Sequence, residues 1–82
     1  MIIKPLSTAV DIDAAADNVS SATLVSVVNT NTTACLIANS NGNEIYIAAG
    51  ERVLIEKLAS ETLNATTGSS ASVWATSVAY KN

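Results

Sequence analysis

The sequence predicts an all-β domain, a small antiparallel β-sandwich or a partly closed barrel of about six to eight short strands. Short runs rich in Val, Ile and Thr recur along the chain, and clusters of Asn, Gly and Ser separate them. No segment carries the long apolar stripe of an amphipathic helix. A chain of 82 residues has room for one domain, so residues 1–82 are expected to fold as a single unit.

The N-terminal third has the least regular pattern. Residues 1–6 are mostly apolar, and Pro5 favours an extended backbone at Lys4, so we expect an extended arm or an edge strand there. A strand is expected near residues 7–11. The acidic, Ala-rich segment 11–17 favours a loop or one helical turn, because Ala stabilises helices and Asp suits a helix N-terminus.

The next two apolar runs predict a pair of strands and a hairpin. Residues 23–29 and 33–38 are rich in β-branched side chains, and the polar residues 29–32 between them favour a turn. Asn41 and Gly42 follow the second run, and both tolerate the positive φ of a type I′ turn. We therefore expect residues 33–38 to form a hairpin with the run that follows.

Strict alternation marks the centre of the chain. In residues 44–49, Ile45 and Ile47 share one face, which is the pattern of a half-buried strand. Gly50 interrupts the pattern, and residues 52–58 resume it. We expect residues 44–49 and 52–58 to pair across Gly50 as a tight hairpin.

The C-terminal third predicts a short weak strand, a loop and one long strand, over residues 62–66, 67–70 and 71–80. Along the long strand, Trp74 and Tyr80 lie on one face, because side chains alternate between the two faces of a sheet.

Composition argues against several functional classes. The net charge is −3 and only 13% of residues are charged, so Lys and Arg are too few to neutralise a nucleic-acid backbone. The chain has no His, which removes the commonest general base and metal ligand. We therefore expect no enzyme activity, no cofactor and no metal. No run approaches the roughly 20 apolar residues of a membrane helix, so no membrane partner is expected.

The composition also predicts self-association. Hydrophobic residues make up 49% of the chain, but many are Ala and none is Phe, so the core of a lone domain is thin. Cys35 is the single cysteine and cannot form an internal disulfide, and its apolar neighbours predict a buried, unreactive thiol. A surface of small neutral side chains suits permanent packing, and we expect copies of the chain to associate.

Two groups of acidic residues are candidate sites, and a structural role is favoured for both. Asp11, Asp13 and Asp17 lack the Gly and the terminal Glu that a calcium-binding loop requires. Glu51 and Glu56 lie an odd number of residues apart and point to opposite faces of a strand, so they do not form a catalytic pair. We interpret these glutamates, together with Glu61, as solvated edge charges.

Five apolar residues are the candidates for partner binding: Ile2, Ile3, Leu6, Trp74 and Tyr80. The first three would attach the extended N-terminal segment to a sheet edge, either of another subunit or of their own domain. Trp74 either fills the core or acts as the central anchor of an interface, and Tyr80 shares either role.

Three stretches, residues 22–29, 45–57 and 74–80, resemble small virion structural proteins of tailed bacteriophages. The resemblance covers residues 18–82 and depends on β-hairpin patterns, not on catalytic signatures. It implies a compact β fold that acts as a capsid decoration or cement subunit, or as part of the tail or neck. Segment 11–17 matches nothing in that group.

The resemblance implies a non-enzymatic subunit that oligomerises, for example as a trimer, and bridges neighbouring subunits of the major capsid protein or of another virion protein. Its expected location is the virion, on the capsid surface, after synthesis in the host cytoplasm. A tail or neck adaptor is the alternative within that group. A small carbohydrate-binding module, in which Tyr46 and Trp74 stack on sugar rings, is a third hypothesis from a different class.

Overall fold

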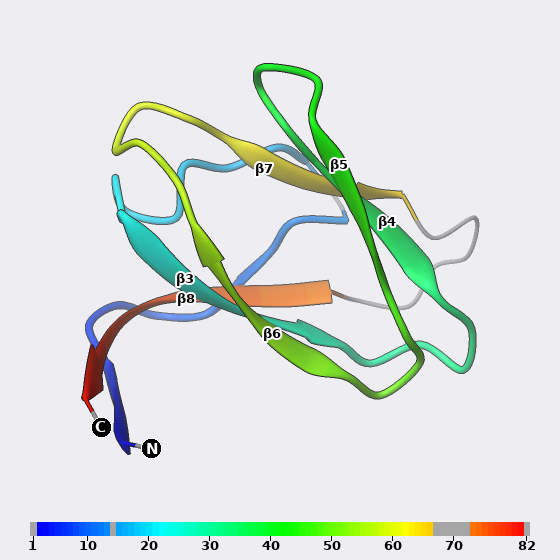
Figure 1. Ribbon diagram of the computed structural model, residues 1–82, viewed down its shortest axis with the longest axis horizontal. Coiled ribbons are helices and arrows are strands. Elements are labelled where there is room, and N and C mark those ends of the chain that lie inside the picture. The colour runs from blue at the N-terminus through cyan, green and yellow to red at the C-terminus, as the bar shows by residue number, and fades with distance from the viewer. Residues whose placement is uncertain (1, 14, 67–72, 82) are drawn as a thin grey trace.

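The computed structural model describes residues 2–13, 15–66 and 73–81. These residues form an all-β fold, as predicted, in which eight strands make two antiparallel sheets around an aliphatic core (Figure 1). The strands are β1 (Ile2–Pro5), β2 (Val10–Asp11), β3 (Leu24–Asn29), β4 (Cys35–Asn39), β5 (Glu44–Ile47), β6 (Arg52–Glu56), β7 (Leu63–Thr66) and β8 (Val73–Lys81).

The predicted strands of the central and C-terminal parts are confirmed as β3 to β8, with ends that differ by about two residues. The strand expected near residues 7–11 is shorter and comprises β2 alone. Residues 1–6 supply β1, which is an edge strand of its own domain. The loop expected at residues 67–70 lies outside the described residues.

The large sheet is built around β8. Its strand order is β1-β8-β3-β6, and β2 also pairs with β8. β1 and β2 follow one edge of β8 as a single interrupted strand, with Pro5 opposite Val78 and Val10 opposite Ala75. The other edge of β8 pairs with β3.

The small sheet has the order β5-β4-β7 and contains the predicted hairpin between β4 and β5. The predicted type I′ turn is wrong, because Gly42 alone of the two central residues has a positive φ, at 84°. The amide of Gly42 donates to the carbonyl oxygen of Asn39 at 3.0 Å. The loop is therefore the longer kind in which one glycine takes the left-handed conformation.

The predicted hairpin between residues 44–49 and 52–58 is also wrong. β5 pairs with β4 in the small sheet, whereas β6 pairs with β3 in the large sheet. The chain crosses from one sheet to the other at residues 48–51. There the amide of Gly50 donates to the carbonyl oxygen of Asn29, and the amide of Asn29 donates to that of Glu51, both at 2.9 Å. The connection is thus bonded to the end of β3 and not across a hairpin.

Segment 12–17 closes the opposite side of the sandwich. The amide of Ile12 donates to the carbonyl oxygen of Val73 in the large sheet at 3.0 Å. The carbonyl oxygen of Ile12 accepts from the amide of Ala65 in the small sheet at 2.9 Å. Asp17 forms an isolated antiparallel bridge with Leu63. The helical turn that the sequence allows is absent from the described residues of this segment, which instead connect the two sheets and bury Ile12 completely.

The side chain of Asn29 is fully buried and satisfies several backbone groups at once. Its Nδ2 lies 3.0 Å from the carbonyl oxygen of Thr33 and 3.2 Å from those of Ile47 and Ala48. Its Oδ1 accepts from the backbone amide of Asn31 at 2.9 Å. One amide group therefore links the end of β3 to the turn after it and to the crossover between the sheets.

A left-handed turn precedes β3. Val19, Ser20 and Ser21 have φ values of 54°, 57° and 56°, although none is glycine. The carboxylate of Asp17 accepts from the amide of Val19 at 2.6 Å, and the amide of Ala22 donates to the carbonyl oxygen of Val19 at 3.2 Å. This conformation costs roughly 1–2 kcal/mol per L-residue. Burial of the Val19 side chain in the core offsets part of that cost.

We expect Asn29→Ala to lower the free energy of unfolding by about 2–4 kcal/mol, because several buried carbonyl groups lose their donor. Urea denaturation followed by circular dichroism measures the change. Asn41→Ala is the matched control, since it removes one exposed hydrogen bond to Glu61 and should cost less than about 1 kcal/mol. Equal losses in the two variants would contradict the role assigned to Asn29.

Ser20→Gly should raise the free energy of unfolding by about 0.5–1 kcal/mol, because glycine adopts a positive φ without a steric penalty. Ser20 is exposed, so the substitution removes no core contact. Ser20→Ala is the control and should bring no such gain. A glycine variant that melts below the alanine variant would show that this turn is not left-handed in solution.

Candidate interaction site

The exposed large apolar residues gather mainly on the edge and the outer face of the large sheet. Four of the five residues predicted to bind a partner are in this set: Ile2, Leu6, Trp74 and Tyr80 are 59%, 56%, 41% and 44% exposed. The fifth, Ile3, is half-buried. The structure therefore brings residues from the two ends of the chain close together on neighbouring strands.

The terminal ribbon, which we define as β1 and residues 78–81 of β8, extends from one corner of the sandwich (Figure 1). Ile2 lies opposite Lys81, and Lys4 lies opposite Ala79. Side chains alternate between the two faces of a strand, and directly paired residues point to the same face. Ile2, Lys4, Ala79 and Lys81 therefore share one face of the ribbon, and all four are exposed. Among the described residues, no strand pairs with the outer edge of β1.

Trp74 lies on the outer face of the large sheet and is not part of the core. Its neighbours on β8, Val73 and Ala75, are fully buried and point inward. The core role, one of the two alternatives for Trp74, is therefore excluded. The predicted alternation of side chains along β8 is confirmed. The face that packs between the two sheets is the one with the smaller side chains, such as Val73 and Ala75, and not the one with Trp74.

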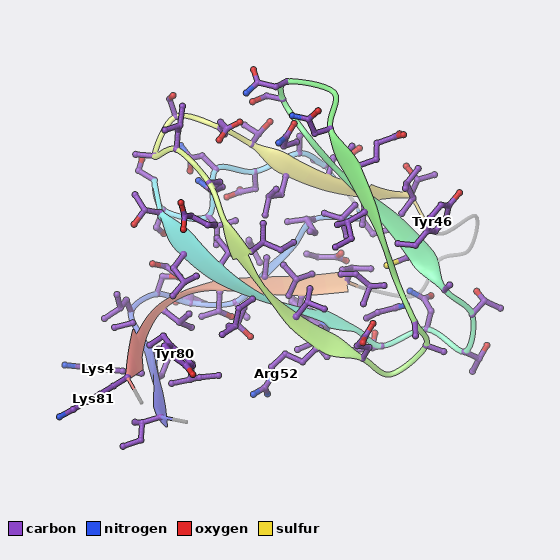
Figure 2. The ribbon with its side chains drawn as sticks, viewed as in Figure 1. Lys4, Tyr46, Arg52, Tyr80 and Lys81 are labelled. Carbon is purple, nitrogen blue, oxygen red and sulfur yellow. The ribbon has the colours of Figure 1, made fainter. Side chains whose placement is uncertain are left out.

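A hollow of about 230 Å³ lies on the outer face, between the terminal ribbon and β6. Tyr80 and Arg52 both lie in the lower part of the molecule as drawn in Figure 2. Ser26 and Thr76 provide hydroxyl groups to the hollow, and Arg52 provides a cation with no hydrogen-bond partner in the described part of the chain. The remaining lining residues are apolar: Ile3, Pro5 and Val78.

A second opening, the intersheet groove, lies where β5 and β6 separate. It has a volume of about 160 Å³. Its apolar lining consists of Ile37, Ile45, Ile55 and Leu63, and its polar lining of Asn39, Asn43, Glu44, Glu56 and Lys57. Sequence reasoning missed this groove because a hairpin between residues 44–49 and 52–58 would have placed both strands in one sheet.

Ile45 shows how incomplete the sandwich is at the groove. It pairs with Ile37 and points to the inner face, as predicted, yet it is 50% exposed. Ile47 on the same face is fully buried, because it lies next to the crossover that Asn29 holds. The groove therefore exposes hydrocarbon that a complete core would cover.

The aspartates at the two ends of segment 11–17 stabilise the backbone. A carboxylate oxygen of Asp11 accepts from the amides of Asp13 and Val73, at 3.0 and 3.3 Å. Asp17 holds the left-handed turn through Val19. Within the described ranges, no three acidic or cysteine side chains gather as a metal site.

Two of the three glutamates interpreted as edge charges, Glu51 and Glu61, also stabilise the backbone by accepting hydrogen bonds from amides. Glu51 accepts from the amide of Ala48 at 2.9 Å, and Glu61 accepts from the amide of Leu58 at 2.7 Å. Each carboxylate caps the turn in which it lies. Glu56 differs, because its exposed carboxylate lines the intersheet groove and accepts no hydrogen bond from a described residue.

Lys57 is a buried cation, and no pattern in the sequence predicted its burial. Its Nζ donates to the carbonyl oxygens of Ala22, at 2.6 Å, and of Leu58, at 3.1 Å. Burial lowers the pKa of Lys57, while the charges of Glu61 and Asp17 act in the opposite direction. The ammonium group connects the end of β6 to the start of β3.

Cys35 is buried in the core, as predicted, and has no disulfide partner. Burial raises the pKa of its thiol, and the negative charge of Asp13 raises it further. Both effects disfavour the thiolate, which is the reactive form.

Tyr46 and Trp74 do not form one sugar-binding platform. Tyr46 is 74% exposed on the outer face of the small sheet, where it pairs with Leu36 (Figure 2). Trp74 lies on the outer face of the large sheet. The two rings therefore project from opposite sides of the sandwich, so a single sugar ring cannot stack on both.

Comparisons with protein-family models, with curated proteins and with solved structures find no match to this chain. No described segment forms a helix long and apolar enough to cross a membrane. The function is therefore inferred from the contacts and the exposure of individual side chains.

The folded protein should react with a thiol reagent at least roughly tenfold more slowly than the urea-unfolded chain, because the Cys35 thiol is buried and weakly acidic. The rate of colour release from a disulfide reagent at mildly alkaline pH measures the difference. Equal rates in the folded and unfolded states would show that Cys35 is accessible.

Proposed function

We propose that this protein is a non-enzymatic structural subunit of a bacteriophage virion, which associates with copies of itself and with a capsid protein as a decoration or cement subunit. The single observation that carries the proposal is the exposure of Trp74, Tyr80, Ile2 and Leu6 on one sheet and its edge. The resemblance of three stretches of the chain to small virion proteins supports the same function.

The chemistry of this surface suits permanent packing. Trp and Tyr are rigid side chains that bury a large area at a small entropic cost when a partner covers them. The outer face is hollowed beside the terminal ribbon, and the lining of this hollow is apolar or neutral except for the cation of Arg52. A partner that fills the hollow would cover apolar surface that the lone subunit leaves in water.

The proposed mechanism is mechanical. Each subunit covers a seam between neighbouring capsid proteins and buries a modest apolar area there. Repetition over the shell turns many such contacts into resistance against internal pressure. Several acidic groups, such as Asp11, Glu51 and Glu61, stabilise the chain's own turns, which suits a rigid building block.

Trp74→Ala should lower the free energy of unfolding by less than about 1.5 kcal/mol but abolish co-sedimentation with virus shells that lack the subunit. Val73→Ala is the matched control, because the neighbouring side chain is fully buried. It should cost about 2–3 kcal/mol and leave binding of the folded protein intact. Binding by Trp74→Ala equal to that of the wild type would contradict the proposal.

The number of copies in purified particles separates a decoration subunit from the tail or neck adaptor that is the alternative. Quantitative mass spectrometry of intact virions measures this number of copies. A copy number comparable with that of the major capsid protein supports decoration, whereas the copies of a single ring indicate an adaptor. Absence from the particles would contradict both.

A further inference from the structure

The charged side chains of this protein divide into two groups. Several carboxylates and one ammonium group stabilise the chain's own backbone, as described for Asp11, Glu51 and Lys57. Arg52, in the hollow of the outer face, is exposed and has no hydrogen-bond partner in the described part of the chain. Away from that hollow, Glu44, Glu56, Lys4 and Lys81 are also exposed, and their side chains have no hydrogen bond or ion pair with a described residue. These four charges are therefore available to a partner.

The two unpaired carboxylates lie at one site, the intersheet groove. Glu44 begins β5 and Glu56 ends β6, and both line the groove around its apolar floor. Lys57 also lines the groove, but its ammonium group is buried and donates to Ala22 and Leu58. The groove thus combines an apolar floor with an acidic rim.

The two unpaired ammonium groups lie at another site, the terminal ribbon. Lys4 and Lys81 share its exposed face with Ile2, which is 59% exposed. Figure 2 shows the side chains of Lys4 and Lys81 pointing away from the body of the molecule in the same direction. The ribbon thus presents one aliphatic side chain between two cations.

We propose that the terminal ribbon of one copy docks into the intersheet groove of the next copy. In this contact Ile2 enters the apolar floor, and Lys4 and Lys81 face Glu44 and Glu56. The outer edge of β1 has no strand partner among the described residues, nor do those of β5 and β6, so main-chain hydrogen bonds between the copies can add to the contact.

The inference deepens the proposed function and depends on its self-association. Because the ribbon and the groove are different surfaces, the contact is head-to-tail, and such contacts close into a ring or continue as a filament. A closed ring of any number of copies is compatible with this contact, including the trimer expected above and a two-fold dimer with two reciprocal ribbon-to-groove contacts. The outer face with Trp74 remains available for the capsid protein.

Charge reversal with complementation tests the contact. Lys4→Glu with Lys81→Glu reverses the ribbon, and Glu44→Lys with Glu56→Lys reverses the groove; all four positions are exposed. Each variant alone should associate at least about tenfold more weakly than the wild type, as measured by light scattering. An equimolar mixture should recover contacts between unlike variants, because the ribbon of each then meets the opposite charge in the groove of the other. A ring with an odd number of copies keeps one contact between like variants, so recovery is then seen by light scattering as dimers or larger even-numbered assemblies.

Thermal unfolding monitors the fold of each variant, and salt dependence of the wild type tests the contact without any substitution. Association of the wild type should weaken in about 1 M NaCl, where the screening length falls to about 3 Å. Salt-insensitive association, single variants that associate like the wild type, or a mixture that does not recover would overturn the ribbon-to-groove contact while self-association stands. A wild type that stays monomeric at high concentration would overturn the self-association itself.

Discussion

The buried amide of Asn29 is the interaction on which the two-sheet arrangement depends. A crossover between two packed sheets leaves peptide groups inside the protein that no ladder can satisfy, and each such group is costly to bury. Asn29 donates to Thr33, Ile47 and Ala48 at this point. It therefore allows β5 and β6 to belong to different sheets, and their separation further along creates the intersheet groove.

The sequence predicted the strands well but their partners less well. Alternation identifies which face of a strand is apolar, and on this basis Ile45 and Ile47 were placed correctly. It does not identify the neighbouring strand, so Gly50 was interpreted as a hairpin turn although the chain changes sheets there. Side-chain hydrogen bonds from Asn29, far away in the sequence, decide that outcome, and no local pattern encodes them.

The candidate site was also predicted only in part. The exposed residues Ile2, Leu6, Trp74 and Tyr80 were identified from the sequence because large apolar side chains in a small, weakly charged chain seek a partner. The intersheet groove could not be predicted, since it arises from strands that were expected to pair. Ile12 and the left-handed turn at Val19 were also missed, because an acidic Ala-rich segment without glycine gives no signal for either.

The position of β8 in the sheet determines when the protein can fold during its synthesis. This strand pairs with β1, β2 and β3, yet it follows all of them in the chain. A ribosome makes roughly 5–20 residues per second, so the earlier strands wait without their central neighbour until residues 73–81 emerge. The nascent chain exposes unpaired apolar strands during that interval, and such strand edges are prone to aggregation.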